Sequence, residues 1–185
     1  MPIVEPATYD VGQGTVSVRW RFDLDPEMVW TGLTDQLWVR RWLGTPRGAY
    51  ALGGGVGLGG VVQIELGDGQ VQSVVRSCQL WRRLEVSWSV PGEALSVVDL
   101  KLAPAGQQCH APGAAADAGE GRCAGASVSG TDLTLIHTGV GPLAREYAIG
   151  WHAHLIYLAA ALRASPMALD RYWEVHERVA RAYVR

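Results

Sequence analysis

The stretch GPLAREYAIGWHAHLIYLAAALR, residues 141–163, is the longest uninterrupted helical pattern in the chain. Gly141 and Pro142 suit the start of a helix, because a proline at the first helical position gives up a hydrogen bond that it could not have made there. Large apolar residues then recur at spacings of three and four and share one face of the predicted helix: Tyr147, Trp151, Leu155, Leu158 and Leu162. We expect the rest of the chain to supply the surface that covers this face.

The segments before this helix predict an antiparallel sheet. Residues 15–22 alternate apolar with polar side chains, which is typical of a strand with one buried face. Similar strand patterns, separated by turn residues such as Gly67-Asp68-Gly69 and Pro91-Gly92, recur at 61–66, 70–78, 83–90, 95–102 and 131–138. The short turns between successive strands indicate a meander that forms one curved sheet.

Shorter helices are expected on either side of this meander. Asp25-Pro26-Glu27 combines an N-cap, a first-turn proline and an early acidic residue, and it predicts the start of one helix. Asp35 predicts the cap of a second short helix that carries Trp38 and Trp42. We expect this pair to fold against the mouth of the sheet. A further helix is predicted from Ser165-Pro166, and packing on its own domain is favoured over a dimer contact.

Composition narrows the functional classes. A chain of 185 residues is expected to form one domain with a sizeable core. A formal net charge of −2, without a basic run, predicts no nucleic-acid partner. No apolar run is long enough to cross a bilayer and the N-terminus lacks an export signal, so we expect no membrane association and a cytoplasmic location. The preference for arginine over lysine, with no asparagine, indicates a G+C-rich and hence bacterial coding sequence.

The predicted domain organisation has three parts. Residues 1–14 are expected to form an N-terminal tail, 15–163 the main domain, and 164–185 a C-terminal helical extension. Within the main domain, residues 104–129 are small and polar and cannot offset their ordering entropy, so they predict a mobile insertion between two paired strands. The insertion contains Cys109, His110 and Cys123, which lack a regular ligand spacing. We therefore predict no metal site.

A glycine-rich stretch, GGGVGLGG at residues 53–60, matches the pattern G-x-G-x-x-G. In a dinucleotide site this pattern follows a strand and opens a helix, whose N-terminus holds the pyrophosphate. Here a strand-like segment follows instead. A hairpin connection or bulge is therefore favoured over a nucleotide site.

Several short motifs occur in order along the chain: Phe22, Asp25-Pro26-Glu27 with Val29-Trp30, Thr34-Asp35, Arg41-Trp42, Thr131 to Gly139, and Gly150-Trp151 with His154-Leu155. With the order of strands and helices, they resemble the START-like (SRPBCC) superfamily. Within it, the chain is similar to the branch named after the activator of heat-shock-protein-90 ATPase homologues. The resemblance covers roughly Val16 to Leu162, with residues 104–129 as a departure.

The resemblance implies an α+β helix-grip fold, in which a curved antiparallel sheet wraps around a long C-terminal helix and leaves a cavity between them. The C-terminal helix looks like an extension found in some members. START-like proteins include lipid and hormone binders, polyketide cyclases, self-resistance proteins that sequester a toxic metabolite, and the co-chaperone domain of the branch name. They share no catalytic motif, so the resemblance implies neither catalytic residues nor a cofactor.

Inward-facing positions of the strands and the long helix predict the walls of this cavity. Aromatic and aliphatic walls with few polar groups are what an apolar ligand needs. The predicted wall residues are Trp20, Trp88, Leu100, Leu135, Tyr147, Trp151 and Leu155, with Trp30, Trp38 or Trp42 near an entrance. The alternative for each of them is a purely structural place in the core.

His137 shares the inward face of its strand with Leu135 and is the one catalytic candidate. It is suited to bind a ligand or move a proton, although such a histidine is more often satisfied by a neighbouring backbone group. The favoured function is therefore non-catalytic binding of an apolar or aromatic small molecule. The alternatives are a cyclase- or hydrolase-like enzyme that uses His137, and a co-chaperone-type adaptor with a chaperone partner or a second copy of the chain.

Overall fold

The computed structural model describes residues 6–47, 59–67, 69–105 and 130–183 of the chain. Most of the predicted insertion at 104–129 and of the glycine-rich stretch at 53–60 therefore lies outside the described residues, as do Cys109, His110 and Cys123.

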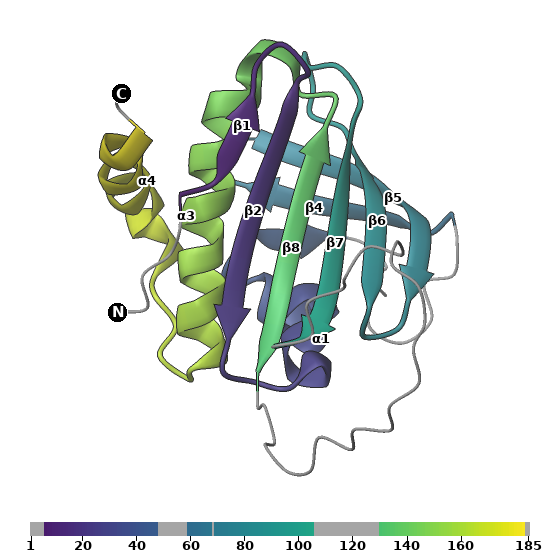
Figure 1. The fold of residues 1–185 in the computed structure, drawn as a ribbon, viewed down its shortest axis with the longest axis vertical. Coiled ribbons are helices and arrows are strands. Elements are labelled where there is room, and N and C mark those ends of the chain that lie inside the picture. Colours follow the sequence, from purple (N-terminus) through teal and green to yellow (C-terminus); the bar gives the residue numbers. More distant parts are fainter. Residues whose placement is uncertain (1–5, 48–58, 68, 106–129, 184–185) are drawn as a thin grey trace, which may run out of the picture.

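In the described part of the chain, eight strands form one antiparallel sheet in the order β1-β2-β8-β7-β6-β5-β4-β3 (Figure 1). The strands are β1 (Thr8–Asp10), β2 (Thr15–Phe22), β3 (Thr45–Arg47), β4 (Val61–Leu66), β5 (Gly69–Gln79), β6 (Arg83–Trp88), β7 (Ser96–Pro104) and β8 (Thr131–Thr138). Consecutive strands from β3 to β8 are neighbours, which confirms the predicted meander. β7 and β8 pair up to Pro104 and Thr131, so the residues between them begin and end side by side.

The helices also follow the expected order. They are α1 (Pro26–Thr34), α2 (Gln36–Val39), α3 (Ala144–Leu162) and α4 (Tyr172–Ala180), with 3-10 turns η1 (Gly141–Leu143), η2 (Leu169–Arg171) and η3 (Arg181–Tyr183). The long helix α3 packs against β1 and β2, while α1 and α4 pack against α3 (Figure 1). This arrangement confirms the predicted α+β helix-grip architecture, in which a curved sheet wraps around a long helix.

Both ends of the chain depart from the sequence prediction. Residues 1–14 were expected to form a tail, but Thr8–Asp10 pairs with β2 as an edge strand. The Ala7 amide donates a 2.7 Å hydrogen bond to the Tyr183 hydroxyl, which joins the two ends. The last helix was expected from Ser165-Pro166, whereas its first turn is the 3-10 turn at Leu169–Arg171. It packs on its own domain, because its apolar side chains Val175 and Val179 are buried.

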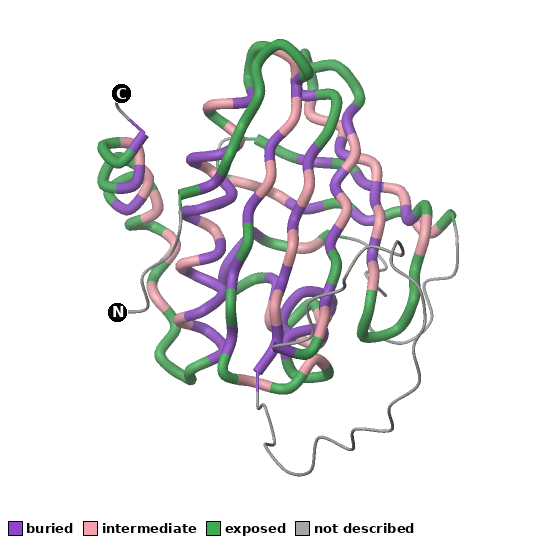
Figure 2. The backbone as a smooth tube through the Cα atoms, in the orientation of Figure 1, coloured by how far each residue is buried: buried purple, intermediate pink, exposed green. Residues whose placement is uncertain are grey.

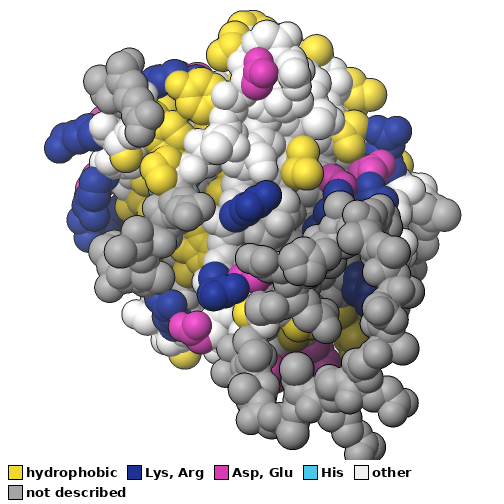
Figure 3. Space-filling model, in the orientation of Figure 1, with side chains coloured by type: hydrophobic (Ala, Val, Ile, Leu, Met, Phe, Trp, Pro, Cys, Tyr) yellow, Lys and Arg dark blue, Asp and Glu magenta, His cyan; other side chains and the backbone are white. Residues whose placement is uncertain are grey.

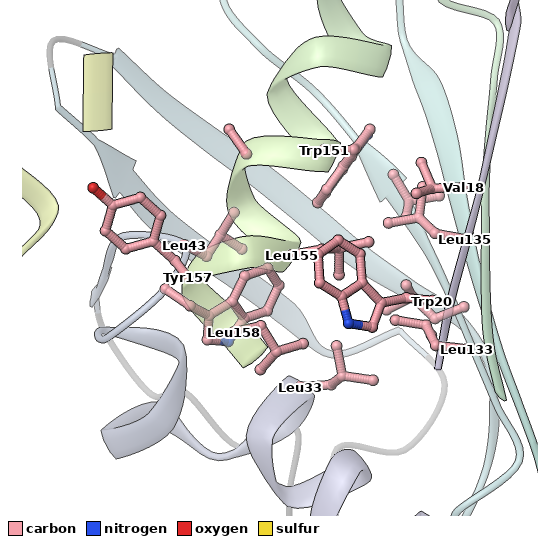
Figure 4. Packing of buried hydrophobic residues seen from close by; sticks show 14 of the residues in the cluster. Val18, Trp20, Leu33, Leu43, Leu133, Leu135, Trp151, Leu155, Tyr157 and Leu158 are labelled. Atoms are coloured by element: carbon pink, nitrogen blue, oxygen red, sulfur yellow. The ribbon is translucent and has the colours of Figure 1, made fainter. Parts of the chain in front are cut away.

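Alternation along the strands separates a buried face from an outer one (Figure 2). In β2, Val16, Val18 and Trp20 are buried, while the residues between them are less so. Figure 4 shows Trp20 extending from the sheet towards Leu155 of α3, with Leu133 beside it. Close packing of this kind stabilises the domain because it removes apolar area from water.

The outer face of the sheet carries charged side chains paired across the strands. Arg83 of β6 contacts Asp99 of β7 at 2.8 Å and Glu85 at 2.7 Å, and Lys101 contacts Asp99 at 3.2 Å. The Arg83 and Lys101 cations lower the pKa of the Asp99 carboxyl against the effect of its partial burial. Figure 3 shows basic and acidic side chains adjoining one another on one face of the molecule. Pairs at the solvated face of a sheet contribute little to stability, because water screens their charges.

Candidate ligand-binding site

An apolar cavity of about 40 Å³ lies between the sheet and α3. Its wall comes from the helices α1 and α3, the turn after α2, and the strands β4 to β7. The lining residues are Leu33, Trp42, Leu43, Val62, Ile64, Ser73, Leu84, Val86, Trp88, Val98, Leu100 and Trp151. Ser73 is the one hydroxyl-bearing residue among them, and the others are aliphatic residues or tryptophans. The cavity therefore suits an apolar group.

Strand alternation explains which residues reach this cavity. Leu84 and Val86 are alternate residues of β6 and face the same side of the sheet. They pair across to Leu100 and Val98 of β7, which makes two adjacent apolar rows. The buried residues of β6 and β7 therefore form the floor of the cavity under α3.

Trp42 is held in the wall by hydrogen bonds at both its side chain and its backbone. Its indole N–H donates to the Gly32 carbonyl of α1 at 2.8 Å. Its own carbonyl accepts a 2.8 Å hydrogen bond from Nδ1 of His154 on α3. Because a carbonyl can only accept, the proton of His154 is on Nδ1. Burial lowers the pKa of His154 from 6.5 to about 4, so the ring is neutral at physiological pH.

The cavity is small for a metabolite. An engineered protein cavity that binds benzene has about 150 Å³, and sites for drug-sized ligands have about 300–1,000 Å³. The 40 Å³ between sheet and helix therefore has to widen before it can hold even one aromatic ring. Some side chains of the wall must therefore move for a ligand to enter.

His137 lies behind two of these wall residues. Its side chain is fully buried, and its ring centre lies 5.9 Å from both the Trp88 and the Trp151 ring centres. The Tyr147 ring meets it edge-on at 4.5 Å. Trp88 and Trp151 line the cavity whereas His137 does not, so the two indoles separate the histidine from the cavity.

Each ring nitrogen of His137 makes one hydrogen bond, and the partners fix which nitrogen donates and which accepts. The Trp151 indole N–H, which can only donate, gives its hydrogen to Nδ1 at 3.0 Å. The proton of the neutral ring is therefore on Nε2, and it is donated to the Ser96 hydroxyl at 2.8 Å. The Ser96 hydroxyl in turn donates to the Trp88 carbonyl at 3.1 Å. Burial lowers the pKa of His137 from 6.5 to about 3, which keeps this ring neutral.

The Ser96–His137 pair is not arranged as a nucleophile and its base. In a catalytic pair the serine donates its proton to the histidine, and a carboxylate orients the other nitrogen. Here the histidine donates to the serine, and an indole N–H occupies the position of the carboxylate. The alternative anticipated from the sequence, a histidine satisfied by its neighbours, describes this geometry, although the partners are side chains rather than backbone groups.

Tyr147 connects this buried cluster to the surface. Its hydroxyl donates a 2.5 Å hydrogen bond to the Glu93 carboxylate in the turn between β6 and β7. Burial first, and then the Glu93 carboxylate, raise the pKa of Tyr147 well above 10. The phenol is therefore protonated at physiological pH, and it fastens the start of α3 to this turn.

The structure places four of the predicted wall residues around the cavity: Trp42, Trp88, Leu100 and Trp151. The others that were predicted lie elsewhere. Trp20, Leu135 and Leu155 are buried in the hydrophobic core, and Tyr147 belongs to the His137 cluster. Trp30 is buried in α1, and Trp38 stacks under the Arg41 guanidinium at 4.9 Å. None of these residues lines the cavity.

Eight cavity residues were not among the predicted wall residues: Leu33, Leu43, Val62, Ile64, Ser73, Leu84, Val86 and Val98. Leu33 and Leu43 lie in or beside short helices, where alternation along a strand gives no signal. Ser73 faces inward in β5, but a serine gives no apolar signal at that position. Its alternation with the buried Val71 and Val75 could have revealed it.

The described part of the chain holds neither a metal-binding cluster nor a membrane-spanning helix. No group of three or more histidine, cysteine, aspartate or glutamate side chains there could hold a metal ion. No helix among those residues is long and apolar enough to span a membrane.

No protein-family model matches the chain, and no curated protein matches it. Its fold is nevertheless similar to several solved structures. CalU16 from Micromonospora echinospora is 22% identical, with a TM-score of 0.63 over 91% of this chain and 84% of CalU16. The BPP1335 protein of Bordetella parapertussis is 18% identical, with a TM-score of 0.63 over 99% of this chain and 91% of its own.

DynU16, a protein of the dynemicin biosynthetic locus, is 19% identical, with a TM-score of 0.61 over 83% of this chain. The match covers 48% of DynU16, so this chain spans about half of that protein. Similarity at these identities establishes the fold rather than an activity. The chain thus has the helix-grip fold, an eight-stranded antiparallel sheet with a long C-terminal helix, that it shares with these proteins.

Proposed function

We propose that this protein binds an apolar or aromatic small molecule, such as a lipid, a polyketide or a similar metabolite, without transforming it. The observation that supports this most directly is the apolar cavity between the sheet and α3, whose wall includes Trp42, Trp88 and Trp151. Indole rings offer large apolar contact area to a flat or alkyl ligand. The cavity is then the deep end of a site that widens when the ligand enters.

The hydrogen-bond geometry around His137 favours binding over catalysis. A general base needs a free lone pair within reach of the substrate. The only lone pair of the neutral ring, on Nδ1, accepts from Trp151, and two indoles separate the ring from the cavity. The enzyme alternative would therefore need both wall residues to leave their places.

DynU16 is a protein of the dynemicin biosynthetic locus, which supports the use of natural products among the first ligands to test. The similarity to the branch of heat-shock-protein-90 ATPase activators supplies the adaptor alternative. An adaptor would not need the cavity, so variants that fill the cavity distinguish the two functions.

Ligand binding is tested on the intact chain in two ways. Native mass spectrometry of gently purified protein is expected to show a retained apolar molecule. Titration with panels of lipids and aromatic polyketides is expected to quench tryptophan fluorescence, since three indoles line the cavity. Absence of a retained molecule, together with no response to any member of the panels, would contradict the proposal.

Filling the cavity provides the specific control. Val98→Leu and Val98→Phe add increasing volume to the wall, and they are expected to weaken binding in that order. Val97→Phe places the same ring on the neighbouring residue, which does not line the cavity, and it is expected to leave affinity unchanged. Circular dichroism confirms that each variant is folded, because overpacking costs about 1–3 kcal/mol. Equal affinity of all the folded variants would place the binding outside this cavity.

A further inference from the structure

We infer that the ligand carries a hydroxyl or carbonyl oxygen on its apolar body, and that the hydroxyl of Ser73 binds this oxygen. The inference rests on the proposed function, since it assigns the polar contact of the same cavity. It starts from the position of one serine in an otherwise apolar wall.

Ser73 interrupts the buried row of β5. The alternate residues Val71 and Val75 on either side of it are 1% and 2% exposed, and Ser73 itself is 4% exposed. By strand alternation all three face the sheet interior. A valine would continue the row, so the hydroxyl is a departure from the pattern of its own strand.

The Ser73 hydroxyl makes no hydrogen bond to any residue that the structure describes. In the described part of the chain, the buried side-chain nitrogens and oxygens without a partner are the indole nitrogens of Trp30 and Trp88, so the Ser73 hydroxyl is not sealed in the core. A hydroxyl in an apolar wall is nevertheless unfavourable as long as it has no partner. A hydroxyl that lines a cavity can instead be satisfied when the cavity is filled. The hydroxyl then lowers the stability of the free protein slightly and forms a hydrogen bond once the ligand is bound.

The other polar groups of the wall are already used or point elsewhere. The indole N–H of Trp42 bonds the Gly32 carbonyl, and that of Trp151 bonds His137. The Trp88 indole N–H makes no hydrogen bond within the described residues, but it lies near the Tyr147 hydroxyl, which does not line the cavity. Ser73 is therefore the side chain that can orient a ligand.

The chemistry of the wall defines the class of ligand. An ordered water needs two to four polar partners, and one free hydroxyl in an apolar wall does not provide them. A ligand oxygen needs only one polar partner, because the rest of the ligand is held by apolar contacts. A carbonyl would accept from Ser73, whereas a ligand hydroxyl could donate or accept. An apolar molecule with a single oxygen substituent satisfies both the wall and the serine.

Phenol and toluene test this assignment, because they have nearly the same size and differ in the hydroxyl. Their dissociation constants are measured on the 15N-labelled protein from the indole signals of Trp42, Trp88 and Trp151. The preference for phenol over toluene is expected to fall about three- to tenfold in Ser73→Ala, the factor that corresponds to one neutral hydrogen bond. Ser73→Cys keeps a side chain of similar size with a weaker donor, and an intermediate preference is expected.

Ser77→Ala on the same strand is the matched control, because Ser77 is half-buried and does not line the cavity. It is expected to keep the preference of the natural protein. An unchanged preference in both Ser73 variants, with both probes still binding, would overturn the role of Ser73 and leave the proposed function standing. Failure of both probes to shift any of the three indoles in the natural protein would overturn the two together.

Discussion

The indole N–H of Trp151 donates a 3.0 Å hydrogen bond to Nδ1 of His137. This bond decides which nitrogen carries the proton, because Nδ1 must accept and Nε2 must then donate to Ser96. Protonation of the ring would put a hydrogen on Nδ1 opposite another donor. The contact therefore adds to the burial that lowers the pKa of His137 to about 3.

The free energy of unfolding is expected to decrease as the pH is lowered below about 6.5. In that range the unfolded chain binds a proton at His137, whose ordinary pKa is 6.5, while the folded chain does not until about pH 3. The unfolded state then holds more protons, so the free energy of unfolding decreases by about 1.4 kcal/mol per pH unit for such a histidine. His154, with its pKa lowered to about 4, contributes in the same direction down to that pH. Urea unfolding between pH 7.5 and 4.5 measures the slope.

His137→Gln is the matched variant for this prediction. A glutamine can accept from Trp151 with its oxygen and donate to Ser96 with its nitrogen, but it does not titrate. The slope is expected to become shallower by about 1.4 kcal/mol per pH unit. The same slope with and without the imidazole would show that His137 binds its proton equally well in both states.

Ser73→Ala is expected to stabilise the protein without ligand by up to about 1 kcal/mol, because it removes a hydroxyl from an otherwise apolar wall. Thermal and urea unfolding of the variant and of Ser77→Ala measure the effect. A clear loss of stability in Ser73→Ala alone would show that the hydroxyl makes a favourable bond in the free protein.

Tyr183→Phe tests whether the two ends of the chain hold each other. The hydroxyl accepts from the Ala7 amide at 2.7 Å and lies 3.0 Å from Nδ1 of His152. Its removal leaves the buried partners without a bond and is expected to cost about 1–3 kcal/mol. Faster hydrogen exchange of the Ala7 amide should accompany the loss. Tyr9→Phe, at an exposed ring, is the control, and equal effects of the two variants would argue against the contact.

Gly14→Ala tests the close approach of the β1–β2 turn to the start of the long helix. Gly14 has a φ of +61°, and an added Cβ would lie 2.6 Å from the Gly141 nitrogen. Gly67 has a similar φ of +54° but open space around it, so Gly67→Ala measures the conformational cost alone. That cost is expected to be about 1–2 kcal/mol, and Gly14→Ala is expected to exceed it. Equal losses in urea unfolding would mean that the turn can move away from the helix.

The fold was largely predictable because its signals are periodic. Alternation in residues 15–22 and the helical spacing from Tyr147 to Leu162 each reflect one buried face, and both elements form as expected. Strand β1 was missed because its three residues are exposed and are held by main-chain pairing, which leaves no apolar pattern. The late start of α4 was missed because a proline after Ser165 fits a loop as well as a first helical turn.

The site was predictable only in part. Periodicity tells which side of the sheet a residue faces, but not where the helix touches that side. Trp20 and Leu135 face inward like Leu100, yet α3 packs closely on their part of the sheet and leaves its gap over β4 to β7. The Ser96–His137 bond joins residues 41 positions apart, and its direction depends on a third residue, Trp151. Local patterns carry no information on such contacts.

The proposed function requires the cavity between sheet and helix to open and take up an apolar molecule. Titration of the 15N-labelled protein with toluene tests it most directly, since the indole signals of the tryptophans report separately. We expect Trp42, Trp88 and Trp151 to shift together and to saturate, while the exposed Trp81 and Trp173 keep their positions. Shifts confined to Trp81 and Trp173, or no saturable shift at the three cavity indoles, would show that toluene does not enter this cavity.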